Sequence, residues 1–352
     1  MDDSVITDAL YDIDQTLVEG AGAEAVSPGS ILTMSDEDKK KWMKGIQEEL
    51  DSLNKLRVYE ELDKKDCYER YWKKGIKTVK LPSKPVLVKK HEHEGAKNWK
   101  AKARICACGI LEAGFGGDVI NRSEAPATYE LRVLMAPGET QQWSIGALDV
   151  KTAFLHAELI DDEDGVYLVM PPPLLIKLGM VQPGVYWKLK KVLYGLRSGP
   201  KRWGIARDRE LKKQIVNTQE ESVGVCIQGE VCKNLWRVEH KGEVVARFLV
   251  YVDDTAVSGS REWAQAVLDM VSGIWTCKVS GMLVPNEVTK CKGASQGSEV
   301  SRSQSATLVT KLTFLGMTIE YKEGVLTMRQ RQYILNKLDG RNRLQGQGKA
   351  CF

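Results

Sequence analysis

Two adjacent carboxylates, Asp253 and Asp254, lie between two largely apolar runs, residues 246–250 and 255–257. The β-prone flanks predict that Tyr251-Val252-Asp253-Asp254 forms the tip of a hairpin in a sheet. Paired carboxylates can hold divalent metal for phosphoryl transfer, in which the ions stabilise charge on the transferring phosphate. Asp is also a common turn residue, because its side chain can bond its own backbone, so this pair alone is more often structural than chemical. The chemistry therefore depends on a partner elsewhere in the chain.

Asp149 is the candidate partner, because it lies near the end of a second predicted strand, residues 144–150. A two-metal site needs carboxylates from separate strands that converge on ions roughly 3.5–4 Å apart. Neighbouring residues on a strand point to opposite faces, so Asp253 and Asp254 have different roles unless the turn rotates them. We expect Asp253 to bridge with Asp149 and Asp254 to contribute less directly.

Composition restricts the class of protein. The chain has 352 residues, 43% hydrophobic and 28% charged, which predicts a soluble globular protein of two or three lobes. No segment offers the ~20 apolar residues of a membrane span, and the acidic N-terminus is not a secretory signal. Eight scattered cysteines without a C-x-x-C pair, and only four histidines, do not favour a zinc site. These features predict reduced thiols, a cytoplasmic or nuclear location and no membrane partner.

Charge is distributed unevenly along the chain. Residues 1–38 contain ten acids and no Lys or Arg, whereas residues 71–104 hold eleven basic residues and residues 186–213 hold ten. One such block is commonly a solvated surface. Two blocks near a candidate acidic metal site favour nucleic acid, whose phosphates pair with the cations and whose bases stack on aromatic rings. The interleaved aromatic residues are Tyr71, Trp72, Trp99, Tyr186, Trp187, Tyr194 and Trp203.

The first half of the chain carries the predicted small basic lobe. Ser35 with acids after it predicts a helix N-terminus, and apolar residues at three- and four-residue spacing from Trp42 to Leu56 extend that helix. Residues 79–90 contain Pro82 and Pro85 and are predicted to be edge strands. Residues 103–108 are predicted to be a further strand and the Gly-rich residues 111–118 a turn.

The elements predicted after residue 143 are those that must position the acids. Strands are expected at 144–150, 166–170 and 185–189, the acid-bearing hairpin at 244–258, and a second hairpin from 311–319 and 324–328. Helices are expected at 201–214, 263–274 and 330–338. Residues 280–307 are predicted to be a polar insertion loop.

Several motifs together resemble a known family. In chain order they are residues 148–155 (Leu-Asp-Val-Lys-Thr-Ala-Phe-Leu), 166–168 with Pro171-Pro172, 188–197, 251–254 and Phe314-Leu315-Gly316. Upstream, residues 42–50 resemble the helix that opens the family's domain and residues 100–104 its basic fingers motif. In order and spacing these resemble the reverse transcriptase of copia-type (Ty1/copia) LTR retrotransposons, over roughly residues 35–338.

The resemblance implies an α+β right-hand polymerase fold, with an antiparallel palm sheet, helices and a fingers lobe. It implies RNA-directed DNA synthesis with two Mg²⁺ ions (or Mn²⁺), dNTPs and a template with primer, within a larger Gag-Pol polyprotein. The implied organisation is an acidic flexible tail at 1–34, an N-terminal helix and fingers lobe at 35–142, a palm with the acids at 143–279, the insertion at 280–307, a palm end with a primer-grip-like hairpin and helix at 308–340, and a basic tail at 341–352.

Site residues carry over by motif. Asp149, Asp253 and Asp254 match the catalytic, metal-binding triad. Phe154 matches the aromatic ring that rejects a ribose 2′-hydroxyl by clash, although a core aromatic is an equally good interpretation. The remaining matches are Lys151, Thr152 and Ala153, whose backbone N–H groups would bind triphosphate, Lys102 and Arg104, which would bind phosphate, Ser198 beside template and nucleotide, and Leu315 and Gly316, which would position the primer.

The sequence also departs from the family pattern. Ser198 stands where the family usually has Gln, the fingers motif ends in Ala107-Cys108-Gly109, and residues 125–132 are about two residues short. Nothing after residue 338 resembles the RNase H domain that follows in the family, and nothing before residue 35 resembles integrase or protease, so we expect a fragment, a truncated copy or an isolated domain. Two alternatives therefore stay open: an inactive remnant that only binds nucleic acid, and a binding module that works without metal.

Overall fold

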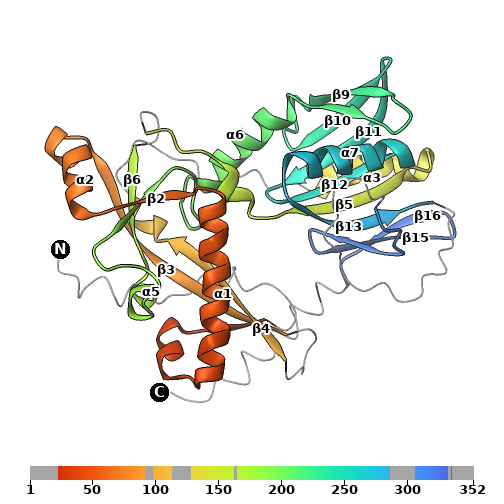
Figure 1. Cartoon of the computed structure of the whole chain (residues 1–352). Helices are drawn as coiled ribbons and strands as arrows, with labels where there is room; N and C mark the ends of the chain where they lie inside the picture. The colour runs from red at the N-terminus through yellow and green to blue at the C-terminus, as the bar shows by residue number, and fades with distance from the viewer. Residues whose placement is uncertain are drawn as a thin grey trace, which may run out of the picture. The chain divides into compact units, whose positions relative to one another are not determined.

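The computed structural model describes residues 23–91, 98–112, 128–161, 165–285, 306–331 and 334 (Figure 1). The chain forms two compact units, and each is discontinuous in sequence. Unit 1 draws on Met1–Asn121 and Phe154–Ala206, and unit 2 on Arg122–Ala153 and Arg207–Phe352. The lobes predicted from the sequence are consecutive ranges, and those ranges stay predictions.

Unit 1 is built on a six-stranded sheet. Its order is β1-β3-β6-β7-β2, with β4 also pairing with β3. β3 and β6 are parallel, and the other pairs are antiparallel. The strands are β1 (Ala23–Val26), β2 (Tyr59–Leu62), β3 (Thr78–His91), β4 (Trp99–Ala107), β6 (Val166–Met170) and β7 (Tyr186–Leu189).

β3 corrects the prediction of edge strands at 79–90, because it is one long strand inside the sheet. Its first part pairs only with β6, up to Pro82 opposite Met170, and its next part only with β4, where Pro85 lies opposite Ile105. β1 pairs with the other edge of β3 only farther along the strand, at residues 87–90. Each proline therefore lies where the strand has a partner on one side only, so its missing N–H costs no ladder hydrogen bond.

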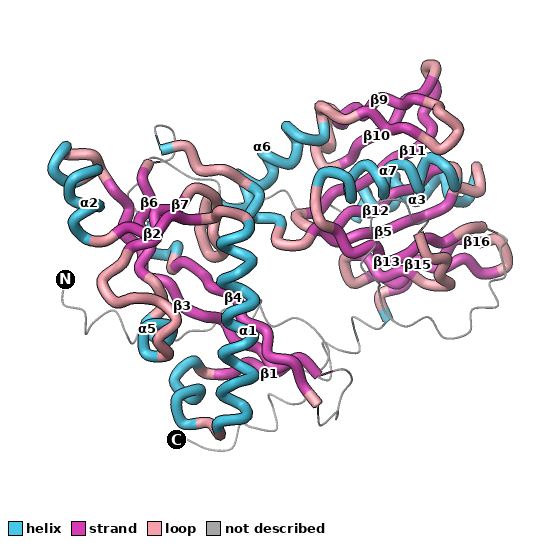
Figure 2. The backbone as a smooth tube through the Cα atoms, viewed as in Figure 1, coloured by secondary structure: helices cyan, strands magenta, loops and turns pink. Residues whose placement is uncertain are grey.

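The predicted first helix is confirmed as α1 (Asp36–Lys55). The amide of Asp38 donates to the Ser35 hydroxyl at 3.3 Å, which caps the helix N-terminus. α1 lies beside β4 (Figure 2), and Trp42, Ile46 and Leu53 of its apolar stripe are fully buried. The shorter helices of unit 1 are η2 (Pro28–Thr33), α2 (Lys64–Arg70), η3 (Trp72–Lys74), η4 (Gly109–Glu112), η5 (Ala153–His156, beginning on the last residue of a unit 2 segment) and α5 (Pro173–Lys177).

Unit 2 contains an antiparallel seven-stranded sheet of order β13-β5-β12-β11-β10-β9-β8 and a three-stranded sheet β14-β15-β16. Its strands are β5 (Ser144–Val150), β8 (Ile215–Asn217), β9 (Val223–Gln228), β10 (Leu235–His240), β11 (Glu243–Tyr251), β12 (Asp254–Gly259), β13 (Cys277–Leu283), β14 (Leu312–Phe314), β15 (Met317–Lys322) and β16 (Val325–Arg329). Its helices are α3 (Thr128–Thr140) and α7 (Arg261–Ile274), and α6 (Gly199–Leu211) begins in unit 1 and ends in unit 2.

α3 and α7 cover opposite faces of the larger sheet. Leu131 and Leu134 of α3 pack in one core cluster with Ala147 of β5. The neighbouring Gly146 faces the other way, where an added Cβ would lie 2.8 Å from Leu268 of α7. β5, which carries Asp149, is therefore covered by a helix on each side and held rigidly.

Most predicted elements of unit 2 are confirmed, with two corrections, and unit 1 adds a third. β13 extends to Leu283, so the first residues of the predicted insertion form a strand. The strand predicted at 311–319 is broken by a turn at Leu315-Gly316, with φ of 49° and 74°, into β14 and β15. In unit 1, β1 and η2 replace the end of the predicted flexible tail. Residues 1–22, 113–127, 286–305 and 341–352, and most of the helix predicted at 330–338, lie outside the described residues.

No helix of the described ranges is long and apolar enough to cross a membrane.

Two helical glycines test the packing of α1. At Gly45 an added Cβ would lie 2.9 Å from the carbonyl oxygen of Ala101, whereas at Gly204 of α6 nothing lies within 4 Å. We predict that Gly45→Ala lowers the unfolding free energy by about 1–2 kcal/mol through overpacking, and that Gly204→Ala raises it by up to about 1 kcal/mol through helix propensity. Urea denaturation of both variants checks this, and an increase in stability for Gly45→Ala would contradict the close approach of α1 to β4.

Candidate active site

The register of the sheet brings two of the three acids together. β11 and β12 form a hairpin in which Tyr251 pairs with Asp254, and β12 pairs with β5 so that Asp254 lies directly opposite Asp149. Direct partners in an antiparallel pair point to the same face, with Cβ atoms about 4.5–5.5 Å apart. Asp253 lies in the two-residue turn, where its carbonyl oxygen accepts the N–H of Val150 at 2.7 Å. The expectation that Asp253 bridges with Asp149, with Asp254 contributing less directly, stays a prediction.

The hairpin turn holds an unusual backbone conformation. Val252, its first residue, has a φ of 48°. Two-residue hairpin turns need a positive φ at this position, and Gly or Asn normally supply it. A β-branched residue there is strained, by on the order of 1–3 kcal/mol. The sheet ladder on both sides and the Asp253–Val150 hydrogen bond hold the strained turn, and with it the two carboxylates.

The three carboxylates interact electrostatically. Burial, and after it the negative charges of Asp253 and Asp149, together raise the pKa of Asp254 to about 7. On the other side of Asp149, Lys278 of β13 is its direct strand partner. The acids therefore form a concentration of negative charge at one end of the sheet.

This donor set fits a divalent cation in its chemistry. Carboxylate oxygens are the ligands that Mg²⁺ prefers, and a cation would offset the repulsion that raises the pKa of Asp254. Within the described residues, no three His, Cys, Asp or Glu side chains form a ready-made metal-binding group. The site thus has the charge and ligand type for a metal, and the side chains must draw closer to bind one.

The loop after Asp149 presents backbone donors, though fewer than predicted. The N–H of Lys151 donates to the carbonyl oxygen of Thr276 at 2.9 Å and is used within the fold. Thr152 has a φ of 55° and its hydroxyl donates to the Lys151 carbonyl at 2.7 Å. No acceptor for the N–H groups of Thr152 and Ala153 is found in the described part of the chain. A left-handed residue in such a turn aims successive N–H groups into an anion-binding hollow.

Phe154 belongs to unit 1 and packs there against Tyr194. The two rings meet edge to face, with centroids 6.3 Å apart, and the guanidinium of Arg104 lies 5.4 Å from the Tyr194 ring centre. Lys102 lies two residues before Arg104 on β4, so both cations point to the same face. Burial raises the pKa of Glu49. The Ile105 N–H and the positive charges of Arg104 and Lys102 lower that pKa and so offset part of the rise. Phe154 is half-buried.

Ser198 lies in a buried hydrogen-bond cluster that the sequence did not indicate. Its side chain is 6% exposed, and its hydroxyl donates to the Glu112 carboxylate at 3.1 Å. The same carboxylate accepts the Tyr167 hydroxyl at 2.8 Å and the Arg197 N–H at 2.7 Å. Burial and Glu112 together raise the pKa of Tyr167. Glu112 was missed because its partners lie more than 50 residues away and no local pattern marks them.

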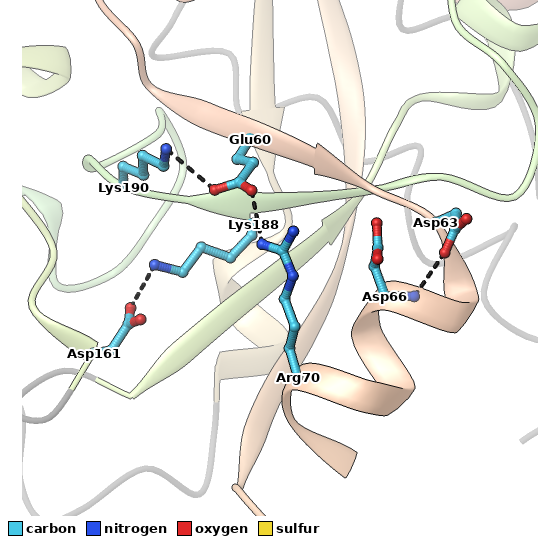
Figure 3. A network of polar contacts seen from close by, with 7 residues as sticks. All are labelled: Glu60, Asp63, Asp66, Arg70, Asp161, Lys188 and Lys190. Carbon is cyan, nitrogen blue, oxygen red and sulfur yellow. Dashed lines mark hydrogen bonds and ion pairs between the residues drawn. The ribbon is translucent and has the colours of Figure 1, made fainter. Parts of the chain in front are cut away.

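The basic blocks are less available than the sequence suggested. Glu60 pairs with Lys190 at 3.1 Å and Arg70 at 2.8 Å, and Asp161 pairs with Lys188 at 2.8 Å (Figure 3). The two cations beside Glu60 lower its pKa. Figure 3 also shows Asp63 accepting the amide of Asp66 at the start of α2. These cations balance acids within unit 1.

The predicted stacking role is wrong for two aromatic residues. Trp187 and Trp203 are 0% and 1% exposed, so they belong to the core. Trp72 has Lys80 3.9 Å from its ring centre and donates to Thr78 at 3.1 Å. The aromatic rings near cations are predicted to stack on bases, but the fold itself buries the rings of Trp187 and Trp203.

Comparison with known proteins identifies the family. The family described as reverse transcriptase (RNA-dependent DNA polymerase) matches residues 73–269, more than half of the chain and the whole stretch that holds the three acids. The chain belongs to this reverse transcriptase family.

Curated relatives of this reverse transcriptase domain are retrotransposon proteins. The Pol polyprotein from transposon RE1 of Arabidopsis thaliana is 28% identical over 50% of this chain, and that from transposon TNT 1-94 of Nicotiana tabacum is 28% identical over 64%. A solved foamy viral protease–reverse transcriptase in complex with double-stranded DNA aligns with 80% of this chain and 34% of its own, at 16% identity and a TM-score of 0.39. The matches cover 11% and 15% of the two polyproteins. The predicted resemblance to copia-type retrotransposon reverse transcriptases is confirmed.

Asp254 is predicted to reduce the stability of the metal-free protein. Its folded-state pKa of about 7 lies above the ordinary 3.8, so the folded state binds the proton more tightly and stability falls as pH rises between these values. We predict that in EDTA Asp254→Asn raises the unfolding free energy by roughly 1–3 kcal/mol at about pH 8 and by much less at about pH 4. Urea denaturation at both pH values checks this. Glu243→Gln, an exposed acid on the same hairpin, is the control, and an equal effect of both variants would contradict the prediction.

Glu112 is predicted to stabilise unit 1. Glu112→Ala leaves two buried hydroxyls and one N–H without their acceptor, at a cost of about 2–4 kcal/mol of unfolding free energy. Glu112→Gln keeps one carbonyl oxygen and should cost about half as much. Chemical denaturation of both variants, with the exposed Glu158→Ala as control, measures the difference. If Glu112→Ala were as stable as Glu158→Ala, the hydrogen-bond cluster would not hold these segments together.

Proposed function

We propose that this chain is an RNA-directed DNA polymerase that adds dNTPs to a primer 3′-hydroxyl with two Mg²⁺ ions. The observation that carries the proposal is the placement of Asp149 and Asp254 as direct strand partners, with Asp253 in the adjoining turn. A sheet gains nothing from like charges placed opposite each other, and such pairs are destabilising. Their presence at the family's catalytic positions is therefore best explained by a cation that they share.

The role proposed for each residue follows from its position in the fold. Asp149, Asp253 and Asp254 would hold Mg²⁺, which when bound lowers the pKa of the attacking hydroxyl and stabilises charge on the transferred phosphate. The N–H groups of Thr152 and Ala153 are suited to the triphosphate oxygens, because a left-handed turn aims them together. Lys151 is not proposed as a backbone donor, since its N–H is already used.

Unit 1 supplies the groups proposed to bind and select the nucleotide. Lys102 and Arg104 share one face of β4 and are proposed to bind phosphate. Phe154 is proposed to exclude a ribose 2′-hydroxyl by steric clash. Its edge-to-face contact with Tyr194 fixes the ring, and a fixed ring discriminates better than a mobile one. Ser198 is proposed to act only indirectly, because its hydroxyl is buried against Glu112.

The proposed partners are a template with primer, dNTPs and a surrounding Pol polyprotein. An exposed cation such as Lys201 would pair with phosphates, whereas Lys188 and Lys190 are held by acids of the fold. Leu315 and Gly316 are proposed to position the primer, and their turn is supported by Phe314 in the core. The alternative, an inactive remnant that binds nucleic acid, makes the same contacts without needing Mg²⁺.

Primer extension on an RNA template separates these functions. We predict Mg²⁺-dependent extension by the wild type and a loss of roughly 100-fold or more in Asp253→Asn, because a lost metal ligand removes several kcal/mol of transition-state stabilisation. Glu243→Gln removes one charge from the far end of the same hairpin and should extend normally. Equal, negligible extension by wild type and Asp253→Asn would leave the remnant as the better description.

A further inference from the structure

The seven-stranded sheet of unit 2 ends in a strand whose outer edge is open. β8 is last in the order of that sheet and pairs only with β9 in the described part of the chain. The Thr218 N–H donates to the Ser222 carbonyl oxygen at 3.0 Å, so these two residues form a hydrogen-bonded pair. Such pairs alternate with non-hydrogen-bonded ones in an antiparallel ladder. Val216 therefore bonds to β9, and the N–H and C=O groups of Ile215 and Asn217 point outward.

A groove follows this open edge, between β8 and α7, which contact each other. The groove consists of two adjoining cavities of about 280 Å³ and about 400 Å³. Asn217, Ala266 and Asp269 line both cavities, so the two are continuous. On α7 the lining reaches from Glu262 to Gly273, which lie about 16 Å apart along a helix. An extended peptide of about five residues spans that length.

The smaller cavity is negatively charged and contains an unsatisfied acid. The Oε1 atom of Glu262 is buried and accepts no hydrogen bond from the described residues. Asp269 lies about two turns farther along the same face of α7. Two carboxylates against the one cation of Arg261 leave a net negative charge on the lining. A buried carboxylate oxygen without a donor is costly, and the ammonium or guanidinium group of a ligand would supply that donor.

The wall of the smaller cavity is held in place by Gln265. Its side-chain amide donates to Asp269 at 2.9 Å, and its carbonyl oxygen accepts the Ala306 N–H at 2.7 Å. The chain after Ala306 is tied to β13, because the Met282 N–H donates to the Thr307 carbonyl oxygen at 2.9 Å. The cavity is therefore preformed, and a ligand that enters it has little of the protein to order.

The larger cavity has a mainly apolar lining. Ile215, Met270 and Ile274 contribute to it, together with Ala266. Ile215 is 54% exposed, so this large apolar side chain is left open to a ligand. At Gly273 an added Cβ would have no atom within 4 Å, which shows that the helix leaves free space there. The larger cavity therefore suits an apolar side chain, which gains from leaving water.

We propose that this groove binds an extended peptide of a partner protein, which pairs with β8 and places a basic side chain in the smaller cavity and an apolar one in the larger. Strand addition of this kind takes its affinity from main-chain hydrogen bonds and its specificity from alternate side chains. Ile215 and Asn217 provide the main-chain groups, and Glu262 and Asp269 bind the basic side chain. A three-residue edge is too short to recruit a whole sheet, but it can anchor one peptide strand.

The groove is separate from the proposed active site. No residue that lines it is among those proposed to hold metal, nucleotide or primer. The inference therefore does not depend on the proposed function, and peptide binding can be measured in EDTA without nucleic acid.

Fluorescence anisotropy with a labelled Thr-Arg-Thr-Val-Thr peptide tests the proposal. We expect a dissociation constant of roughly 1 mM or lower for the full chain. In a paired strand, the residues whose side chains point away from α7 are those that bond to Ile215 and Asn217. The same peptide N-methylated at its threonines cannot donate these hydrogen bonds, and should bind at least about 10-fold more weakly.

Two pairs of variants test the two cavities. Glu262→Gln/Asp269→Asn removes both acids and should weaken binding roughly 10-fold, whereas Glu230→Gln/Glu243→Gln removes the same charge from exposed positions of unit 2 and should change it by less than about twofold. Gly273→Leu fills the larger cavity and should also weaken binding roughly 10-fold. Its control is Gly204→Leu, which adds the same side chain to open space on α6.

Several results would overturn the proposal. These are no binding by the wild type at about 1 mM peptide, equal affinity for the N-methylated peptide, or equal affinities of a variant and its control. Sedimentation of the chain alone tests the other occupant, a second copy. A concentration-dependent dimer that is lost in Gly273→Leu would mean that a second copy fills the groove in place of a partner peptide. Failure of primer extension has no bearing on any of these measurements.

Discussion

Three carboxylates at one end of a sheet are the constraint on which unit 2 depends. Asp149 and Asp254 face each other across two strands, and Asp253 occupies the turn beside them. Like charges in such positions repel, and the burial that raises the pKa of Asp254 makes them costlier. The surroundings resist this repulsion. β5 is paired on both sides and has a helix on each face, so it cannot move away.

A comparable constraint operates in unit 1 through close backbone contacts. Gly195 has a φ of 85°, and an added Cβ would lie 2.1 Å from the carbonyl oxygen of Ala107. Gly109 approaches the Gly195 carbonyl just as closely, and the Ala107 N–H donates to Tyr194 at 2.7 Å. Only glycine fits in either place. With Glu112 accepting from Arg197 and Ser198, these contacts fix the turn that supports the rings of Tyr194 and Phe154.

Local rules account for what the sequence predicted well. The structure contains the helix predicted to begin after Ser35, the strand predicted at residues 144–150 and the hairpin predicted from the two apolar runs around Asp253. Each depends on neighbours within a few residues. Register does not, since it is set by how β12 aligns with β5, and so local patterns could not show that Asp254 lies opposite Asp149. The burial of Trp187 and Trp203 was missed for the same reason: cations near them in sequence do not report what packs against them in space.

The hairpin that carries the acids has two features that cost stability, a strained backbone and a buried charge. Val252 holds a backbone conformation that disfavours β-branched residues, and Asp254 is a carboxylate whose ionisation the fold opposes. The sheet ladder and the Asp253–Val150 hydrogen bond hold both features in place, at a cost in stability. A sheet optimised only for stability would place Asn-Gly in this turn and an apolar residue opposite position 149. The arrangement instead trades stability for charge density. This trade is reasonable if the proposed divalent cation supplies the missing counter-charge, and the proposed metal-dependent enzyme then accounts for this hairpin better than a binding module that works without metal.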